Sequence, residues 1–246
     1  MIPKIIHYSW VGTEIPDNVK IRINGWKRAL PGWKFMFWNE SNYDFNQFWF
    51  TREKMREKNW GYATDELRYD VINKYGGFYL DTDMIIKKDL SSLLNEDMIW
   101  GFMYDNSLLT SFFGATPNHP FLNTILAEYS EHKNKEDLFR MTSNPFVTNI
   151  FLKKMPNFEP NGEMQSLNFG SKVIKVFPRD YFCYPSRNKE ANYTEHLFDN
   201  SWGTSNKGVY GMVKHEMRKI FPILYGNIAN KRGVNYSKQF ISKEKL

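Results

Sequence analysis

The sequence predicts a single α/β domain, and three observations support this prediction. Its 246 residues are enough for one well-buried domain, and an α/β fold of this size is commonly a single unit. Apolar stretches at residues 3–8 and 33–38 flank a helical pattern, which indicates a right-handed β-α-β unit. A second helical pattern, at residues 62–75, leads through two glycines into another short apolar strand. We therefore expect a mixed, mainly parallel central sheet flanked by helices.

Turn and capping residues set the order of the elements. Pro16 suits the first turn of a helix over residues 15–30, and Pro31-Gly32 ends that helix. The next helix carries an apolar residue at every fourth position and should stop at a pair of glycines, because glycine supplies the left-handed residue that closes a helix: Ala63, Leu67, Val71 and Tyr75, then Gly76-Gly77. Later strands are expected at residues 84–86 (as a continuation of the strand at 78–80), 97–102, 111–115 and 173–177, with a helix over 118–132.

Two carboxylates follow the strand at residues 78–80. Side chains alternate faces in a strand, so Tyr79, Asp81 and Asp83 would share one face, opposite Phe78 and Leu80. Two such carboxylates repel each other and lose water when partly buried, and a divalent cation would offset that cost. Oxygen ligands of this kind suit Mg²⁺ or Mn²⁺, often shared with nucleotide phosphates. The alternative is a solvated acidic loop.

Asp65 and Arg68 lie three positions apart on the preceding helix and are therefore neighbours on one of its faces. As an ordinary surface ion pair they would contribute only about 0.3–0.5 kcal/mol. Beside the acid pair, they would instead form part of one cleft.

The order of these residues resembles the sugar-binding region, with its DXD motif, of glycosyltransferase family 32. The matching positions are Ala63, Asp65, Arg68, Tyr69, Gly76-Gly77, Tyr79 and Asp81-x-Asp83. That family includes yeast-type α-1,6-mannosyltransferases and bacterial capsule and exopolysaccharide transferases, and it is similar here to the large clostridial glucosylating toxins. The resemblance implies a GT-A type nucleotide-sugar fold with Mn²⁺ or Mg²⁺ as cofactor.

The resemblance also implies a role for each matching residue. Asp81 and Asp83 would hold the metal and the donor diphosphate, and Asp65 and Arg68 would contact the donor sugar; these four form the implied catalytic set. Thr64 and Tyr79 would belong to the same donor site.

Trp10 follows the first strand, where open α/β sheets usually take their nucleotide. Its ring could stack on a base, or it could simply pack in the core. Trp10-Val11-Gly12 is similar to the family's Trp-containing element that stacks on the base, which favours the first interpretation.

Two later segments are also implied to face the substrates. His196 and Asn200 could complete the metal shell, although His196 could equally have a supporting or structural role, and Trp202 would donate its indole N–H to a phosphate. At residues 142–145 relatives usually carry Thr-Gly-Pro before a helix; here Asn144 replaces the glycine. Asparagine tolerates the left-handed conformation, so the turn, which is expected to face the acceptor, could be kept.

Composition narrows the setting. With Cys183 as the one cysteine, no internal disulfide can form, which fits a reducing, cytoplasmic compartment. The N-terminus lacks the pattern of a secretory signal, and no stretch approaches the roughly 18–20 apolar residues of a membrane span. We expect a cytoplasmic protein, attached at most to the inner face of the cell membrane.

The excess positive charge lies at the C-terminus. Residues 207–246 hold nine basic and two acidic residues, a net charge of +7, so the preceding 206 residues carry −1 of the total of +6. We divide the chain into a GT-A domain, residues 1–206, and a basic helical extension, residues 207–246. A helical pattern over 209–228, kinked at Pro222, would pack on the domain or rest on anionic lipid.

These features predict a metal-dependent, retaining hexosyltransferase. Its donor would be a nucleotide sugar, with a UDP-sugar favoured and GDP-mannose as a second candidate. Its acceptor would be a hydroxyl of a capsular, exopolysaccharide or other cell-surface glycan, or of a lipid-linked oligosaccharide. Two alternatives remain: a toxin-like transferase that modifies a protein, and a nucleic-acid-binding protein, suggested by the pI of about 9.1 but disfavoured by the acid-rich centre.

Overall fold

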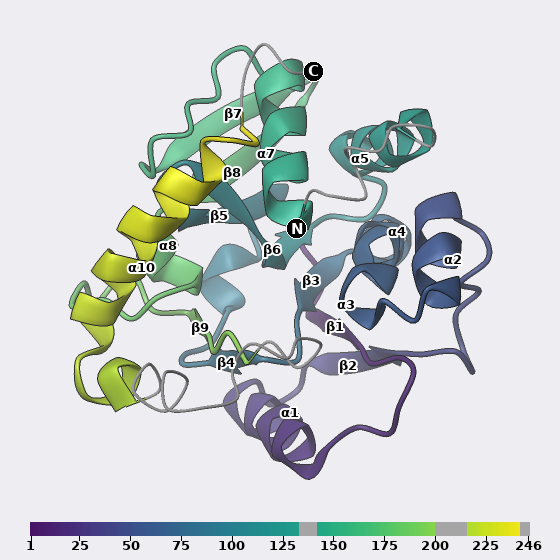
Figure 1. Ribbon diagram of the computed structural model, residues 1–246, viewed down its shortest axis with the longest axis horizontal. Helices are drawn as coiled ribbons and strands as arrows, with labels where there is room; N and C mark the ends of the chain where they lie inside the picture. The colour runs from purple at the N-terminus through teal and green to yellow at the C-terminus, as the bar shows by residue number, and fades with distance from the viewer. Residues whose placement is uncertain (133–141, 200–215, 242–246) are drawn as a thin grey trace.

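Seven strands form one mixed sheet with helices on both faces (Figure 1). The computed structural model describes residues 1–132, 142–199 and 216–241. The strand order is β2-β1-β3-β6-β5-β8-β7. β1 pairs in parallel with β2 and β3, and β5 pairs in parallel with β8, whereas the other three neighbouring pairs are antiparallel. The predicted α/β class with a mixed, helix-flanked sheet is confirmed.

The elements have the following bounds. The strands of the large sheet are β1 (Ile5–Ser9), β2 (Lys34–Trp38), β3 (Gly77–Leu80), β5 (Met98–Tyr104), β6 (Ser107–Ala115), β7 (Gln165–Phe169) and β8 (Lys172–Phe177), and a second sheet holds β4 (Met84–Ile86) and β9 (Thr194–His196). The helices are α1 (Asp17–Ala29), α2 (Trp49–Arg56), α3 (Trp60–Ala63), α4 (Asp65–Tyr75), α5 (Pro120–Glu131), α7 (Ser143–Lys154), α8 (Arg179–Phe182) and α10 (Pro222–Ser237), with a 3₁₀ turn at Ser91–Leu93.

The sheet separates two apolar cores. On one face, α2, α4, α5 and α7 pack around Trp100 and Phe113; on the other, α1 and α8 pack around Phe112. The alternation predicted for β3 holds within the strand, since Tyr79 belongs to the first core and Phe78 to the second.

The helix predicted over residues 62–75 is in fact two helices. Thr64, with φ −104° and ψ 8°, interrupts the helix between α3 and α4. At the far end, Gly76 and Gly77 have φ values of +64° and +104°, as the predicted glycine stop requires. A Cβ on Gly77 would lie 2.6 Å from the carbonyl oxygen of Ile5, so its lack of a side chain lets β3 approach β1.

The prediction that residues 84–86 continue β3 is wrong. After Leu80 the chain turns, and the Met84 N–H donates to the Asp81 carbonyl over 3.0 Å. β4 then pairs antiparallel with β9, with Met84 opposite His196. This turn takes Asp81 and Asp83 out of the strand and brings a segment more than 100 residues later beside them.

The C-terminal region is helical in part. Residues 216–220 form a helical segment, and a second helix, α10, begins at Pro222. Proline thus separates two segments instead of kinking one helix. Residues 207–215 of the predicted extension lie outside the described residues. Among the residues that the structure describes, no helix has the length and apolar character needed to cross a membrane.

Gly76 offers a test of this local fold. A Cβ there would lie 2.7 Å from both Pro3 and Pro117, in a left-handed backbone. We expect Gly76→Ala to lower the free energy of unfolding by about 3 kcal/mol or more, because overpacking adds to backbone strain. Gly170→Ala is the matched control, since φ is +61° and no atom lies within 4 Å. It should cost about 1–2 kcal/mol. Equal losses in urea unfolding would contradict the packing argument.

Candidate active site

Asp81 and Asp83 directly follow the carboxyl end of β3, an inner strand of the large sheet. The Asp81 N–H donates to the carbonyl of Ser111 in β6 over 2.9 Å, which fixes the start of the turn. His196, at the end of β9, reaches the same place because β9 pairs with β4. One ligand atom from each of Asp81, Asp83 and His196 lies within 4.8 Å of the others. Two carboxylates and an imidazole form a donor set that fits Mn²⁺ or Mg²⁺.

The two nitrogens of His196 have different environments. The Phe198 N–H donates to Nδ1 over 2.9 Å, and Nε2 lies 3.6 Å from Asp83 Oδ1. In the neutral ring of this arrangement the proton therefore sits on Nε2. For Nε2 to ligate a cation, the bond from Phe198 to Nδ1 must break.

Arg68 lies beside the acid pair and is almost fully buried. Its side chain is 4% exposed and that of Asp65 is 3% exposed, with 3.0 Å between the Arg68 Nη2 and Asp65 Oδ1 atoms. This burial excludes an ordinary surface ion pair. The same Nη2 lies 3.7 Å from Asp81 Oδ1, and Nη1 donates to the Thr110 carbonyl over 2.9 Å. The guanidinium also lies 5.0 Å from the ring centre of Tyr79.

Burial shifts the ionisation of these groups. It raises the pKa of Asp65, against the pull of Arg68, and it raises the pKa of Asp81, which Arg68 lowers and Asp83 raises. Although burial alone would lower it, Asp81 and Asp65 hold the pKa of Arg68 well above its usual value. Arg68 is therefore a permanent cation next to carboxylates that are costly to keep charged.

A pocket of about 450 Å³ opens at this point. Of the residues predicted for the site, Arg68, Asp81 and His196 line it. Asp65 and Tyr79 are buried outside its lining, although Tyr79 contacts Arg68 and its hydroxyl bonds to Ser9 over 2.8 Å. Thr64, 8% exposed, supplies a carbonyl to Arg68, 3.4 Å from its Nε. The predicted residues Asn200 and Trp202 lie outside the described residues.

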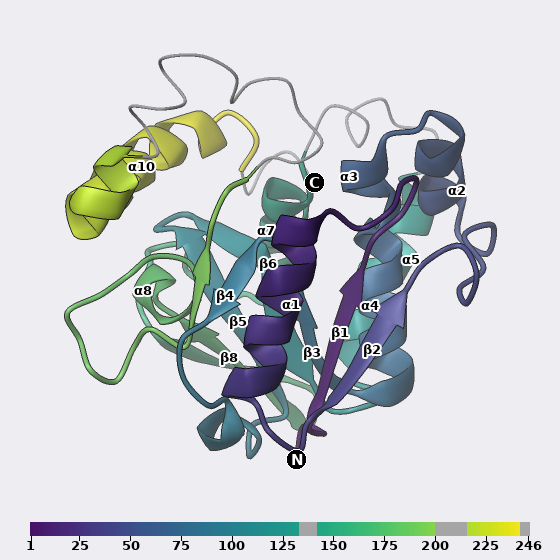
Figure 2. The same ribbon diagram turned by 90° about the horizontal axis from the view of Figure 1, so that it is seen from below.

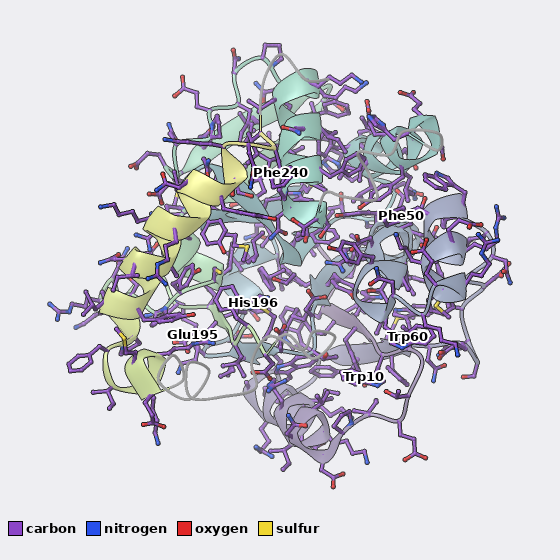
Figure 3. The ribbon with its side chains drawn as sticks, in the orientation of Figure 1. Trp10, Phe50, Trp60, Glu195, His196 and Phe240 are labelled. Atoms are coloured by element: carbon purple, nitrogen blue, oxygen red, sulfur yellow. The ribbon has the colours of Figure 1, made fainter. Side chains whose placement is uncertain are left out.

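Trp10 is placed differently from the predicted stacking geometry. Its ring is 4% exposed and packs in the second core, and its Nε1 donates to Thr13 over 3.1 Å. Trp60 packs against neighbouring Gly12, and both tryptophans are labelled in Figure 3. A base could stack on Trp10 only after a rearrangement, so its role in base binding stays a prediction.

Sequence reasoning missed two parts of the pocket wall, those from α3 and β6, whereas the start of α7 lies in the segment, residues 142–145, that was expected to face the acceptor. One wall comes from Asn59, Gly61 and Tyr62 around α3, and the other from the middle of β6, at Thr110 and Ser111, and the start of α7. Ser111 is 4% exposed, and its hydroxyl has no hydrogen-bond partner within the described structure. Ser111 thus lines the pocket while its own buried hydroxyl oxygen keeps unused hydrogen-bonding capacity. The only signal for the β6 wall in the sequence was the polar pair Thr110-Ser111 directly before the apolar pair Phe112-Phe113.

Asn144 does not form the left-handed turn that the family resemblance suggested. It lies inside α7 and is absent from the positive-φ residues. Its side-chain oxygen instead accepts from the Thr110 N–H over 3.0 Å and from the Thr110 hydroxyl over 2.6 Å. Asparagine therefore fixes the start of α7 against β6 beside the pocket.

Glu66 links α4 to α2 in the interior of the protein. It is fully buried on α4, and its Oε2 accepts the backbone N–H of Thr51 in α2 over 2.7 Å, while Oε1 has no partner within the described structure. Burial raises the pKa of Glu66 to about 7. The native carboxyl therefore holds a proton at pH values where the unfolded chain has lost it.

Comparisons with known proteins agree with this fold. The solved structure of the glycosyltransferase GlyE from Streptococcus pneumoniae TIGR4 shares the fold, with a TM-score of 0.51 and 10% identity, over all of this chain and 66% of that one. The fold is of the GT-A type, and the family model and the named relatives make the chain a glycosyltransferase, as predicted. Residues 16–100 match the family model described as the glycosyltransferase sugar-binding region containing a DXD motif, which bears out the predicted resemblance over this part of the chain.

Two curated enzymes are similar over most of the chain. Inositol phosphoceramide mannosyltransferase 1 of Schizosaccharomyces pombe is 25% identical over 227 residues, which is 89% of this chain and 68% of that protein. The human alpha-1,4-N-acetylglucosaminyltransferase is 33% identical over 183 residues, 73% of this chain and 46% of that protein. The chain thus spans only part of each relative.

The pKa of Glu66 predicts how stability varies with pH. Between about pH 4.5 and 7 the native state binds a proton that the unfolded state lacks, so this group's contribution to stability falls as pH rises through that window. Glu66→Gln keeps an acceptor for Thr51 and cannot ionise. We expect the variant to gain stability relative to the native protein from pH 5 to pH 8, in urea unfolding at each pH. A difference that stays constant over this range would contradict the burial argument.

Proposed function

We propose that the protein is a metal-dependent, retaining hexosyltransferase that uses a nucleotide sugar. A UDP-sugar is the favoured donor and GDP-mannose the second candidate. The proposal rests on one observation: Asp81 and His196, two of the three residues of a cation-type cluster, line the same pocket as the buried Arg68. A diphosphate needs a cation, and a sugar needs fixed donors and acceptors, within one enclosed space.

Asp81 and Asp83 would hold the cation, and His196 lies beside them. A bound divalent cation would neutralise the charge that develops on the leaving diphosphate. His196 can donate a hydrogen bond from Nε2 to a nearby oxygen, or it can ligate the cation once the hydrogen bond from the Phe198 N–H to Nδ1 breaks. It therefore stays a candidate metal ligand, as does Asn200. Asn200 and Trp202 remain candidates for the metal and a phosphate, respectively.

Arg68 and Asp65 would orient the donor sugar. Arg68 faces the pocket, and Asp65 holds its guanidinium in place over 3.0 Å. Thr64 and Tyr79 support that pair from the backbone and from the ring face, respectively. The nucleotide base would lie near Trp10, whose ring must become accessible first.

The pocket lining supports retention by same-face substitution. Among the described residues that line it, Asp81 is the one carboxylate, and it lies 3.7 Å from Arg68 and within the cation cluster. A carboxylate so engaged is poorly suited to act as a nucleophile. The acceptor hydroxyl would then attack on the face that the leaving phosphate vacates, and that phosphate would take its proton.

The acceptor would be a hydroxyl of a glycan or of a lipid-linked oligosaccharide in the cytoplasm, at the inner face of the cell membrane. The name of the fission yeast relative specifies a glycolipid precursor, inositol phosphoceramide, which supports an acceptor with a sugar-like hydroxyl on a lipid. A capsular or exopolysaccharide chain offers the same chemistry. Ser111, which lines the pocket, would contact such a group.

Donor binding tests the proposal directly. We expect one nucleotide sugar to raise the melting temperature only when Mn²⁺ is present. Ligand at about a hundred times its dissociation constant adds roughly 2.7 kcal/mol, which is about 5–10 °C for a domain of this size. Stabilisation by nucleotide sugars without metal, or by none of a panel of UDP- and GDP-sugars with metal, would count against it.

The Asp83→Asn variant tests the role of the metal site without changing the fold. The substitution removes a charge while keeping the shape, so the Mn²⁺-dependent shift should vanish and sugar transfer should fall by at least about 100-fold. Asp97→Asn is the control, because the Asp97 carboxylate pairs with Lys172 over 2.8 Å outside the pocket lining. An Asp83→Asn protein with normal turnover would rule out this mechanism.

A further inference from the structure

The C-terminal helical region exposes a row of bulky apolar side chains. Ile220, Phe221, Leu224 and Ile228 are 61, 56, 52 and 38% exposed. We call these four residues the apolar ridge. Phe221, Leu224 and Ile228 follow one another at spacings of three and four, and Ile220 directly precedes Phe221 where the first helical segment ends, so the four residues lie next to one another along the chain and are not scattered apolar residues.

The ridge faces outward because the inner face of α10 accepts only small residues. Its buried positions are Gly226, Asn230, Gly233 and Ser237. A Cβ on Gly233 would lie 2.3 Å from the ring of Tyr104, and one on Gly226 would lie 3.1 Å from the ring of Tyr184. Bulky side chains cannot replace these residues without moving the helix away from the domain.

Hydrogen bonds fix the rotation of α10 about its axis. Asn230 Nδ2 donates to Asp105 Oδ2 over 2.6 Å, and the Asp105 N–H donates back to Asn230 Oδ1 over 2.9 Å. Farther along, Asn106 donates to the Val234 carbonyl over 3.2 Å. The helix cannot roll to bury the ridge without leaving these acceptors and donors unpaired.

The outer side of α10 becomes basic after the ridge. At helical spacing, Leu224 and Ile228 are followed on the same side by Lys231, Asn235 and Lys238, all exposed. Residues 216–241 carry five basic side chains and one acidic side chain, a net charge of +4. An apolar stretch followed by lysines is the pattern of a helix that lies in a membrane interface, with its apolar part among the acyl chains and its lysines at the headgroups.

The ridge and the pocket lie at the same end of the molecule. Figure 2 shows α10 and α3 on one side, at the end where β1 finishes, and the N-terminus at the opposite end. α3 supplies part of the pocket wall through Gly61 and Tyr62. A flat surface resting on α10 would therefore lie on the side of the molecule to which the pocket belongs.

We propose that the apolar ridge and the following lysines dock this protein on an anionic lipid bilayer. Four half-exposed side chains offer far less than the roughly 800 Å² per partner that a stable dimer buries. Nucleic acid would engage the lysines and leave the ridge in water. An anionic bilayer offers acyl chains to the apolar ridge and negatively charged headgroups to the lysines. The docking itself is independent of catalysis; that it presents a lipid-linked acceptor to the pocket rests on the proposed function.

Vesicle sedimentation with the full chain tests this proposal. We expect the protein to sediment with vesicles of phosphatidylcholine and phosphatidylglycerol in equal parts, and far less with phosphatidylcholine alone or at high salt. Leu224→Ser with Ile228→Ser should weaken partitioning by at least about 10-fold. Lys231→Gln with Lys238→Gln should weaken it by about 5-fold for each lysine.

Two controls separate docking from folding and from catalysis. Met164→Ser with Val173→Ser removes two other exposed apolar side chains, 45 and 37% exposed, and should leave vesicle binding unchanged. Asp83→Asn should bind vesicles normally, and the ridge variant should keep its melting temperature and its metal-dependent donor shift. Failure of the proposed function would thus leave docking intact, and the reverse also holds.

Three outcomes would overturn the docking proposal. The ridge variant could sediment with anionic vesicles as well as the native protein does. The native protein could fail to bind them at low salt. Light scattering could show a dimer that Leu224→Ser dissociates, which would make the ridge an interface between two copies of the chain.

Discussion

The buried ion pair between Arg68 and Asp65 is the interaction on which the rest of the site depends. Removing two charges from water costs several kcal/mol for each ion, and the pair is retained because further groups satisfy Arg68. Those groups come from different elements: the carbonyl of Thr64 before α4, the carbonyl of Thr110 in β6, and the ring of Tyr79 in β3. The guanidinium therefore fixes three elements at the point where the acid pair leaves the sheet.

The features of this site that could be predicted from the sequence are those that depend on local periodicity. The spacing of Asp65 and Arg68 and the glycine stop before β3 follow from helix and strand geometry alone, and both are present. The walls formed by Ser111 and Asn144 depend on how β6 and α7 meet, which no local pattern records. The alternation expected to carry past Leu80 also fails, because the chain turns there and pairs with β9, far along the sequence.

The sequence also could not predict which way the side chains of a correctly predicted element point. Trp10 does follow β1 directly, but the direction of its ring depends on Thr13 and on Trp60 packed against Gly12. The helical period at the C-terminus is likewise present, yet its inward face is set by Tyr104 and Tyr184, which admit only small residues. In both cases steric contacts between distant segments decide which face of an element meets solvent.

Under the proposed function, the charges of the site also dictate an order of binding. Asp65 and Arg68 cancel, which leaves Asp81 and Asp83 as two negative charges at the place where a diphosphate must lie. Two like charges 4 Å apart repel by about 4 kcal/mol at an effective dielectric constant of 20. Burial already raises the pKa of Asp81, so this end of the pocket is costly to charge even without a ligand. A nucleoside diphosphate can therefore bind there only with, or after, a divalent cation. The acid pair thus repels the donor until the metal that it binds is present.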